Sequence, residues 1–388
     1  MAGSARRKLF VLVPVSALAL GLAGCATTSE SKVTIGLVVP TSGAHKSIGA
    51  DMSRGFDLYL DQHGGKLGGR PVDVIEADEG DQVRTGVAAV SRLIEDDEVQ
   101  AVVGLVGSET ALAAKDLADS SKTPLIVTGA GADQFADGSD YLWRTSTTNA
   151  DLGGALGKAV AQETDRGTAY VIASDDAAGH EFSDSFMIAA EASGGRVAGQ
   201  SYTPAAGTEE WSGIFAKVKR SRADAVYAAY TGKEAEAFVT QYRDSGLARS
   251  TPLYGPGFLT EGDVLSTLGG DATGVRTVLH YSEAMDSLMN DAFVKDYRKA
   301  YDATPTAYSV QAYDAAAALD KALDLSDEVN RNEIADSLGS VGTIVSPRGN
   351  WTFDPNHNPD QSYFLRVVRG TPDGPRNVVL QEIASTGT

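Results

Sequence analysis

Val33-Thr-Ile-Gly-Leu-Val-Val-Pro40 is the stretch that decides the fold, because a run of aliphatic and β-branched residues that stops at a proline is typical of a strand. Working outward, residues 47–63 carry apolar side chains at helical spacing and end at Gly64-Gly65, which stops a helix. The same alternation continues to residue 127 and predicts the order β-α-β-α-β-α-β. The predicted strands are 33–39, 72–77, 99–103 and 125–127, and the predicted helices are 47–63, 82–95 and 108–121.

A second series of the same kind begins after Thr147. It predicts strands at 169–173, 196–202, 225–229 and 253–254, with helices at 181–192, 209–220 and 233–245 between them. Strands that alternate with helices form parallel sheets covered on both faces, so we predict an α/β fold with two Rossmann-like lobes, each built on a parallel central sheet.

The rest of the chain is less regular. It carries predicted strands at 275–280, 351–353, 363–368 and 378–383 and predicted helices at 291–301 and 309–323. A tail of this length predicts that the chain crosses back through a multi-strand hinge to complete each lobe. We therefore expect lobe one in residues 33–148 and 281–360, and lobe two in residues 149–280 and 361–388.

Residues 1–24 do not resemble part of a fold. Three basic residues (6–8) precede an apolar run (9–23), which is the pattern of a signal peptide and is short for a membrane span. The run ends in Leu22-Ala-Gly-Cys25, which resembles a bacterial lipobox, so we predict cleavage before Cys25 and a lipid on its thiol. The alternative is a chance cysteine in a signal peptide. Residues 25–32 are small and polar and would form the lipidated tether.

Charge and cysteine content exclude several classes of function. The chain of 388 residues carries 33 basic and 52 acidic residues, a net charge of −19. This argues against a nucleic-acid binder, which would show a basic face, and against electrostatic binding to an anionic membrane surface. Cys25 is the only cysteine, so the chain forms no disulfide within itself. The pair Arg6-Arg7 leaves both general secretion and twin-arginine export open.

The expected position of a ligand follows from the predicted fold, because open parallel sheets bind ligands outside the carboxyl ends of their strands. The loops at those ends are rich in Gly, Ser and Thr: 41–48, 104–109, 128–133, 174–179, 230–232 and 256–260. Ser47 and Ser108 begin two predicted helices, whose free N–H groups would suit a carboxylate. The alternative is that both serines are ordinary N-caps, and the two roles are compatible.

The sequence contains no recognisable catalytic or metal-binding constellation. It has no Gly-x-Ser-x-Gly elbow and no P-loop, and its five histidines show no ligand spacing. Asp354-Pro-Asn-His-Asn-Pro-Asp360 begins like a calcium loop but has Pro359 and Leu365 where Gly and Glu are required, so a turn built on Asx side chains is preferred. We predict a protein that is not an enzyme and that needs no metal and no cofactor.

Several short motifs, in matching order and spacing, resemble one family. They are Ile35-Gly-Leu-Val-Val-Pro-Thr-Ser-Gly43, Gly64-Gly-Lys-Leu-Gly-Gly-Arg-Pro71, Val102-Val-Gly-Leu-Val-Gly-Ser108, Thr123-Pro-Leu-Ile126, Ala223-Asp-Ala-Val-Tyr227 and Ala312-Tyr-Asp-Ala315. Together they make the chain similar to the branched-chain amino acid (Leu/Ile/Val) binding proteins of ABC importers, which have the type I periplasmic binding fold. The resemblance covers essentially the whole chain after the signal peptide.

The resemblance implies an exported protein that is anchored by lipid to the outer face of the cell membrane. It would capture a small carboxylate-bearing ligand, such as a branched-chain or other amino acid, between two closing lobes and deliver it to an ABC permease. A monomer is the expected state. A ligand-sensing receptor domain shares the fold and stays an alternative, as does an extracytoplasmic hydrolase, for which no motif is present.

The resemblance also places the family's ligand contacts on this sequence. In lobe one they fall on Ser108, which would bind the carboxylate, and on Ile48, Ala130, Gly131 and Ala132. In lobe two they fall on Ala178, on Thr231 or its neighbour Tyr230, and on Gly257 and Phe258.

One departure from the family bears on the ligand. Gly257 and Phe258 occupy the place where amino-acid binders often carry an acid for the ligand's ammonium group. Glu261, Asp133 and Asp176 are the candidates for that missing role. Residues 353–359, with Gln361, resemble members that bind aromatic or other organic acids. An amino acid, an aromatic or other organic acid and an amide therefore all stay candidate ligands.

Overall fold

The first of two large sheets organises the N-terminal part of the chain. The computed structural model describes Met1 and residues 32–383, apart from 136–137, 165–166 and 205–206. The strands of this sheet follow the order β2-β3-β1-β4-β5-β6 and are parallel except for the short β2. Their bounds are β1 (Val33–Val39), β2 (Lys66–Leu67), β3 (Arg70–Asp78), β4 (Ala101–Gly104), β5 (Leu125–Val127) and β6 (Leu142–Arg144).

The second sheet has seven strands in the order β15-β14-β11-β10-β9-β7-β8. Five neighbouring strands are parallel, and β14 and β15 are added to one edge in antiparallel direction. Their bounds are β7 (Thr168–Ser174), β8 (Arg196–Thr203), β9 (Ala225–Ala229), β10 (Leu253–Pro256), β11 (Arg276–Leu279), β14 (Tyr363–Thr371) and β15 (Gly374–Ile383). A two-stranded piece, β12 (Thr352–Phe353) and β13 (Pro359–Asp360), stands apart from both sheets.

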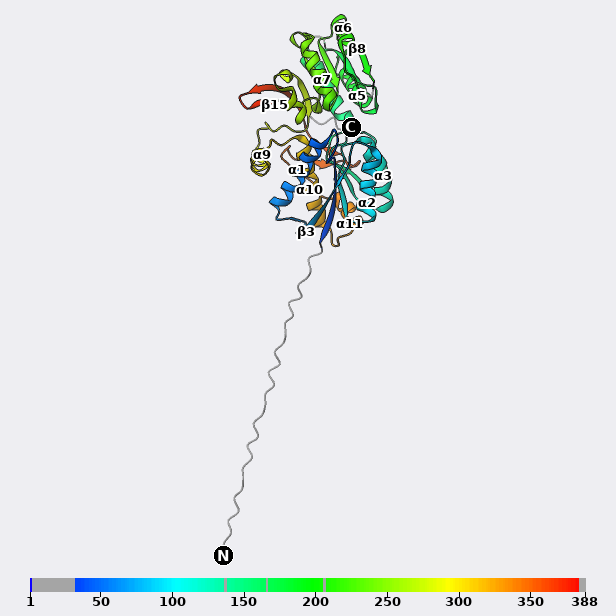
Figure 1. Ribbon diagram of the computed structural model, residues 1–388, viewed down its shortest axis with the longest axis vertical. Helices are drawn as coiled ribbons and strands as arrows, with labels where there is room; N and C mark the ends of the chain where they lie inside the picture. Colours follow the sequence, from blue (N-terminus) through cyan, green and yellow to red (C-terminus); the bar gives the residue numbers. More distant parts are fainter. Residues whose placement is uncertain (2–31, 136–137, 165–166, 205–206, 384–388) are drawn as a thin grey trace. The chain divides into compact units, whose positions relative to one another are not determined.

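Lobe one consists of the first sheet with the helices packed around it (Figure 1). These helices are α1 (Lys46–Gln62), α2 (Val83–Glu95), α3 (Ser108–Ser121), α9 (Leu288–Tyr301), α10 (Ala307–Leu325) and α11 (Arg331–Leu338). Helix α10 runs along α1, and its residues Ala307–Leu319 are all buried. Lobe one is therefore completed by chain that lies between β11 and β14 of the second sheet in sequence.

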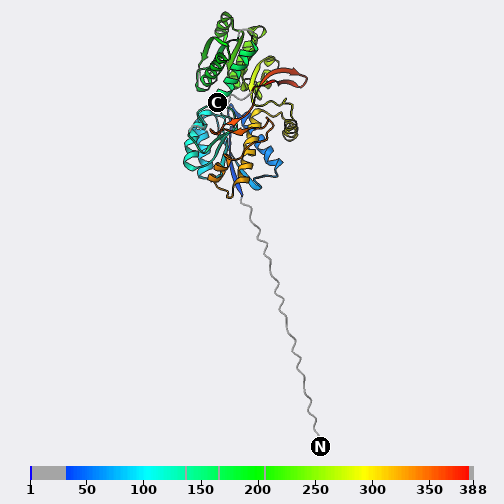
Figure 2. The ribbon, with the colours of Figure 1, turned by 180° about the vertical axis from the view of Figure 1, so that it is seen from behind.

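Lobe two consists of the second sheet and its helices, and Figure 2 shows both lobes from behind. Its helices are α4 (Asn149–Glu163), α5 (Ala177–Ala192), α6 (Ser212–Ser221), α7 (Gly232–Asp244) and α8 (Asp263–Leu268), with short 3-10 turns at Leu247–Arg249, Gly257–Thr260 and Gly269–Ala272. The chain passes between the lobes three times, after β6, after β11 and between β13 and β14.

The predicted α/β fold with two lobes and largely parallel sheets is confirmed, and the predicted strand 225–229 and helix 108–121 have the observed bounds. Strands β2, β6 and β13 and helices α4, α8 and α11 were not predicted. Helix α4 shows no apolar stripe, because nine of its residues are buried and five of those are small Gly or Ala. The expected Asx turn is also confirmed, since Asp354 Oδ1 accepts the N–H groups of Asn356 and Asn358, both at 2.8 Å.

The predicted signal peptide and Cys25 lie outside the described residues. Among the residues that are described, no helix combines the length and the apolar character that a membrane span requires.

Candidate ligand-binding site

A cavity of about 510 Å³ lies between the lobes, at the carboxyl ends of the parallel strands. This volume is in the usual range for sites that enclose small molecules. Lobe one contributes residues from the starts of α1, α3 and α10 and from the loop after β5: Ala44, His45, Ser47, Ile48, Asp51, Val106, Ser108, Gly129, Gly131 and Tyr308. Lobe two contributes residues from α4, α5, α7 and the loop around α8: Asn149, Ala178, Phe182, Thr231, Gly232, Lys233, Glu236, Phe258, Glu261, Gly262, Asp263, Val264, Ser266 and Thr267.

Helix N-termini dominate this cavity. Helices α1 and α3 of lobe one and α7 of lobe two begin on its wall, and their N-cap residues His45, Gly107 and Thr231 make no side-chain capping bond. Ser47 and Ser108 lie in the first turns rather than at the N-cap, so the interpretation of both serines as N-caps is wrong. The backbone N–H groups of these first turns and the partial positive charge of the helix ends favour an anion.

The start of α3 is fixed by a buried acid. Glu79 is 2% exposed, and its two carboxylate oxygens accept the N–H groups of Val106 and Gly107, both at 2.8 Å. Burial raises the pKa of Glu79 to about 7, although the two N–H bonds act in the opposite direction. The side chain lies behind Ser108 and holds the loop that presents this residue to the cavity.

Six of the ten ligand contacts predicted from the sequence line the cavity: Ile48, Ser108, Gly131, Ala178, Thr231 and Phe258. The other four are not among the described lining residues, and each faces elsewhere. Ala130 and Ala132 belong to the apolar core of lobe one. Tyr230 is buried in lobe two, where its hydroxyl lies 3.0 Å from both Thr203 Oγ1 and Trp211 Nε1. Gly257 is buried, and its carbonyl accepts a bond from Arg366.

Sequence reasoning missed several groups on the wall. Tyr308 is the second residue of α10, and its ring stacks on Phe258 with a centroid distance of 5.8 Å, so the two lobes share one aromatic wall. Asn149 begins the unpredicted helix α4, and its side chain donates to Glu181 at 2.7 Å. No motif signals either residue, because Asn149 follows a crossing between the lobes and Tyr308 comes from the irregular C-terminal part of the chain.

The three acids considered as ammonium partners are all engaged at helix N-termini. Asp133 accepts the N–H of Ala150 at 3.0 Å, and Asp176 is the N-cap of α5. Glu261 lines the cavity, but it accepts the N–H of Ala307 at 2.9 Å and a bond from Arg366 at 2.9 Å.

Burial affects the charge of two of these acids. It raises the pKa of Asp133 to about 6. It also raises the pKa of Glu261, while the Arg366 guanidinium and the Ala307 N–H act in the opposite direction. Asp133 and Asp176 are not among the described residues that line the cavity. Of the three acids, Glu261 alone is among the described lining residues, and its two oxygens already accept the N–H of Ala307 and a bond from Arg366.

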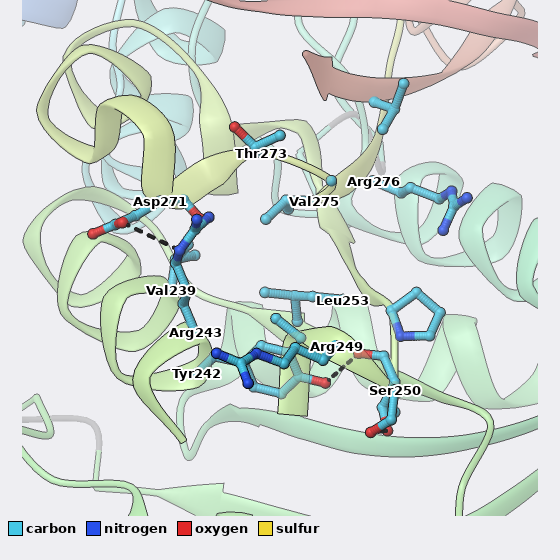
Figure 3. A pocket seen from close by; sticks show the side chains of 15 residues that line it. Val239, Tyr242, Arg243, Arg249, Ser250, Leu253, Asp271, Thr273, Val275 and Arg276 are labelled. Carbon is cyan, nitrogen blue, oxygen red and sulfur yellow. Dashed lines mark hydrogen bonds and ion pairs between the residues drawn. The ribbon is translucent and has the colours of Figure 1, made fainter. Parts of the chain in front are cut away.

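A second cavity, of about 350 Å³, lies in lobe two at the amino ends of β10 and β11 (Figure 3). Arginines stand around its apolar floor. Arg243 donates to the carbonyl of Gly270 at 2.8 Å and pairs with Asp271 at 3.4 Å, and Arg276 pairs with Glu163 at 3.7 Å. Its described walls come from lobe two alone, so a molecule bound there would not bring the two lobes together.

Comparison with known proteins decides the family. A family model described as periplasmic binding protein matches residues 32–374. The chain belongs to this family. A Leu/Ile/Val-binding protein homolog of Brucella abortus is 29% identical over 373 residues, which are 93% of this chain and 94% of that protein.

Solved structures of this family agree with the fold. A solute-binding protein of an ABC transporter from R. palustris, in complex with benzoate, is 30% identical with a TM-score of 0.81, over 92% of this chain and 98% of that chain. A substrate-binding protein of an ABC transporter from Sphaerobacter thermophilus is 28% identical with a TM-score of 0.86 over the same shares. The isoleucine complex of LivJ from Streptococcus pneumoniae, at 22% identity, 90% and 100% coverage and a TM-score of 0.79, supports the fold alone.

These matches make the protein a solute-binding component of an ABC transporter rather than an enzyme, as the motifs had implied. Membership of the periplasmic binding protein family places it outside the cytoplasm and makes a small molecule and a membrane permease its partners. The predicted ligand contacts and the lipid on Cys25 stay predictions.

Proposed function

We propose that this solute-binding protein captures a small aromatic or aliphatic carboxylate that carries no amino group. The placement of the three acids carries this proposal, because Asp133 and Asp176 are not among the described lining residues and Glu261 is already paired with the Arg366 guanidinium. The aromatic wall of Phe258 and Tyr308 supports it, because a planar apolar ligand body would pack on it. The 30% identical relative solved with benzoate supports the same class of ligand.

The carboxylate would bind first to lobe one. Ser108 and the first N–H groups of α3 offer it hydrogen bonds, and the N-terminus of α1 adds partial positive charge. Closure requires a ligand that binds the closed state more tightly, and a shift from 1:99 to 99:1 needs about 5.5 kcal/mol of differential binding. We assign this difference to lobe two, through Phe258 and the uncapped start of α7 at Thr231. Ser108→Ala should then mainly weaken binding, whereas changes at Thr231 should alter closure.

The test compares ligands that differ only in the amino group. A thermal-shift screen of residues 31–388 would contain benzoate, 3-phenylpropanoate with L-phenylalanine, and 4-methylpentanoate with L-leucine. A ligand at 1,000 times its Kd stabilises by about 4 kcal/mol, which gives a clear shift. We expect shifts with the amine-free acids and none with their amino-acid counterparts. Shifts with the amino acids alone would refute the proposal.

A second candidate, a branched-chain amino acid, is favoured by the name of the curated relatives and by two further acids, Glu236 and Asp263, that line the cavity from lobe two. If an amino acid binds, Glu236→Gln or Asp263→Asn should abolish the preference for L-leucine over 4-methylpentanoate. Retention of that preference in both variants would exclude these acids as the ammonium partner.

We further propose a lipid anchor at Cys25, preceded by a signal peptide in residues 1–24, and a monomer that delivers its ligand to the permease. The lobe boundaries of 33–148 with 281–360, and 149–280 with 361–388, are supported by the membership of strands in the two sheets. Mass spectrometry of the membrane-bound protein tests the anchor: a diacylglycerol on Cys25 is expected, and Cys25→Ala should release the protein from the membrane.

A further inference from the structure

Helices α4 and α10 belong to different lobes, and each has a backbone N–H that donates to a carboxylate of the other lobe. Helix α10 packs on α1 in lobe one, and Ala307, its first residue, donates to Glu261 of lobe two at 2.9 Å. Helix α4 packs on α5 in lobe two, and Ala150 in its first turn donates to Asp133 of lobe one at 3.0 Å. The two acids thus reach across the lobe boundary in opposite directions.

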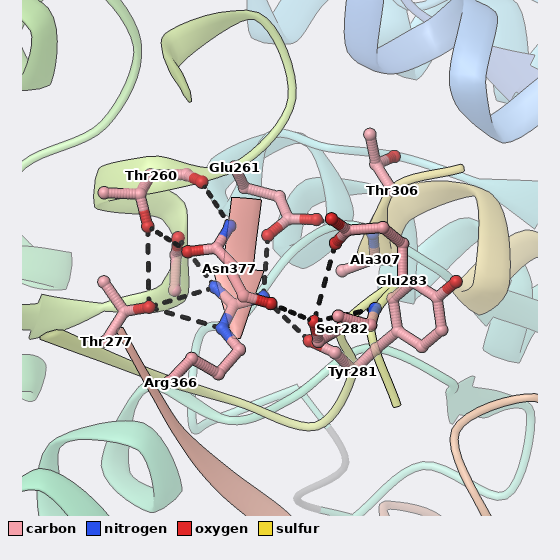
Figure 4. A network of polar contacts seen from close by, with 12 residues as sticks. Thr260, Glu261, Thr277, Tyr281, Ser282, Glu283, Thr306, Ala307, Arg366 and Asn377 are labelled. Carbon is pink, nitrogen blue, oxygen red and sulfur yellow. Dashed lines mark hydrogen bonds and ion pairs between the residues drawn. The ribbon is translucent and has the colours of Figure 1, made fainter. Parts of the chain in front are cut away.

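Glu261 is fixed to lobe two (Figure 4). It is 7% exposed, and its second oxygen pairs with Nη1 of Arg366, a fully buried residue of β14. The same Nη1 donates to the carbonyl of Tyr281 at 2.7 Å, in the segment that leads from β11 to α9. Because these bonds hold the carboxylate in place, the bond to Ala307 is the one that must break if lobe two moves away from α10.

Helix α10 does not need Glu261 for its own cap. Thr306 and Ser309 form a capping box within lobe one, and Thr306 Oγ1 also donates to Asp51 of α1 at 2.9 Å. The bond from Ala307 to Glu261 is an addition from the other lobe. It is a charge-assisted bond at the positive end of a helix, where a carboxylate is favoured.

We propose that Glu261 and Asp133 form a pair of reciprocal latches that stabilise the arrangement of lobes described above. Together they set how much binding free energy a ligand must supply to move the protein between this arrangement and a more separated one. Both are positioning residues for closure, and neither recognises a group of the ligand. The inference rests on the proposed function and deepens it, because it gives Asp133 and Glu261 a role in closure in place of a role in ligand recognition.

The first measurement is the distance between the lobes. Spin labels on Asp116→Cys in α3 and Glu191→Cys in α5 report this distance in residues 31–388, which contain no native thiol. Ala307→Pro removes the donor of one latch, and it suits the site because proline is tolerated at the first helical position and Thr306 before it is extended, with ψ of 173°. Glu261→Asp, which is one methylene shorter, serves as a second variant for this latch.

Asp133→Ala removes the other latch, and Asp176→Ala is its matched control, because Asp176 caps α5 entirely within lobe two. Each latch variant should change the ratio of the populations of the two lobe arrangements, read from the distance distribution, by about tenfold, which corresponds to about 1.4 kcal/mol. It should also change the affinities for 3-phenylpropanoate and L-phenylalanine, where both bind, by one common factor. Asp176→Ala should lower stability and leave the distances unchanged.

Two results would overturn the proposal. The first is a set of latch variants whose distance distributions and affinities all stay within twofold of the parent. The second is a selective loss of L-phenylalanine binding in Asp133→Ala or Glu261→Asp, because this would make the acid an ammonium partner. Failure of the proposed ligand class would be visible separately, as a parent protein that binds no amine-free acid but still responds to the latch variants in its lobe distances.

Discussion

Gly179, in the first turn of α5, provides a sharp test of how this site is built. A methyl group added there would lie 2.0 Å from the carbonyl oxygen of Ser174, the last residue of β7. Ordinary van der Waals contact begins at about 3.4 Å, so Gly179→Ala requires a displacement of about 1.4 Å (3.4 − 2.0) between two backbone segments. Lobe one has the same arrangement, since a methyl group on Gly49 of α1 would lie 1.9 Å from the carbonyl oxygen of Pro40.

The magnitude follows from two opposing effects. Overpacking of this kind costs about 1–3 kcal/mol. A change from glycine to alanine in a helix returns at most about 1 kcal/mol. The net expectation for Gly179→Ala is a loss of about 1–2 kcal/mol of unfolding free energy. Ligand affinity should fall as well, because the displaced loop contains Ala178, which lines the cavity.

Gly213 supplies the control. It lies in the first turn of α6, and no heavy atom stands within 4 Å of the position of an added methyl group. Gly213→Ala should therefore stabilise the protein by about 0.4–1 kcal/mol. The assay is urea denaturation of residues 31–388 for the parent and both variants, with a check that the m-value is unchanged. If Gly179→Ala is as stable as Gly213→Ala, the contact between α5 and β7 yields without cost and the reasoning fails.

Three further predictions concern pH, a buried ion pair and the aromatic wall. Burial raises the pKa of Glu79 to about 7 and that of Asp51 to about 6, so at these two groups the folded state binds more protons than the unfolded state. The unfolding free energy should therefore rise as the pH falls from 7.5 towards 5. Denaturation at both pH values checks this, and a fall in the unfolding free energy would contradict it. Arg348→Met should cost about 3–5 kcal/mol of unfolding free energy, because the fully buried carboxylate of Asp314, 2.7 Å from Arg348 Nε, would lose its cationic partner and keep the N–H of Trp351. A loss below about 1 kcal/mol would show that the pair is dispensable. Phe258→Ala should weaken the binding of 3-phenylpropanoate about tenfold in calorimetry with little change in stability, and an unchanged affinity would remove Phe258 from the ligand site.

The sequence predicted the strands and the amphipathic helices well, since hydrophobic periodicity reports burial of one face. It failed at α4, which is buried on several sides and therefore has no polar stripe. The limited reach of hydrophobic periodicity also explains which site residues were predicted and which were missed. Ser108 and Ile48 follow strands with clear patterns, whereas Tyr308 comes from the irregular tail and packs against Phe258 from far away in sequence.

The hydrogen-bond partners of the candidate acids could not be predicted from sequence for a different reason. Glu261 is correctly placed on the cavity wall, yet its partners Ala307 and Arg366 lie 46 and 105 positions further along the chain. Backbone N–H groups carry no sequence signal, so an acid that holds a helix N-terminus has the same appearance as one that awaits a ligand. The contact map of the lobes, rather than the residue type, distinguishes the two cases.

The burial of α10 against α1 has a consequence for synthesis of the protein. A nascent chain that ends at residue 280 contains every strand of the first sheet, but it lacks the helix that covers α1. Two residues of α1 would then face water. Gly55 has no side chain, which lets the backbone of Ser309 approach in the complete protein, and Tyr59 donates to Asp320 at 2.8 Å. We therefore expect lobe one to stay incomplete until most of lobe two has been made, so that incomplete chains expose apolar surface to chaperones and proteases throughout that interval.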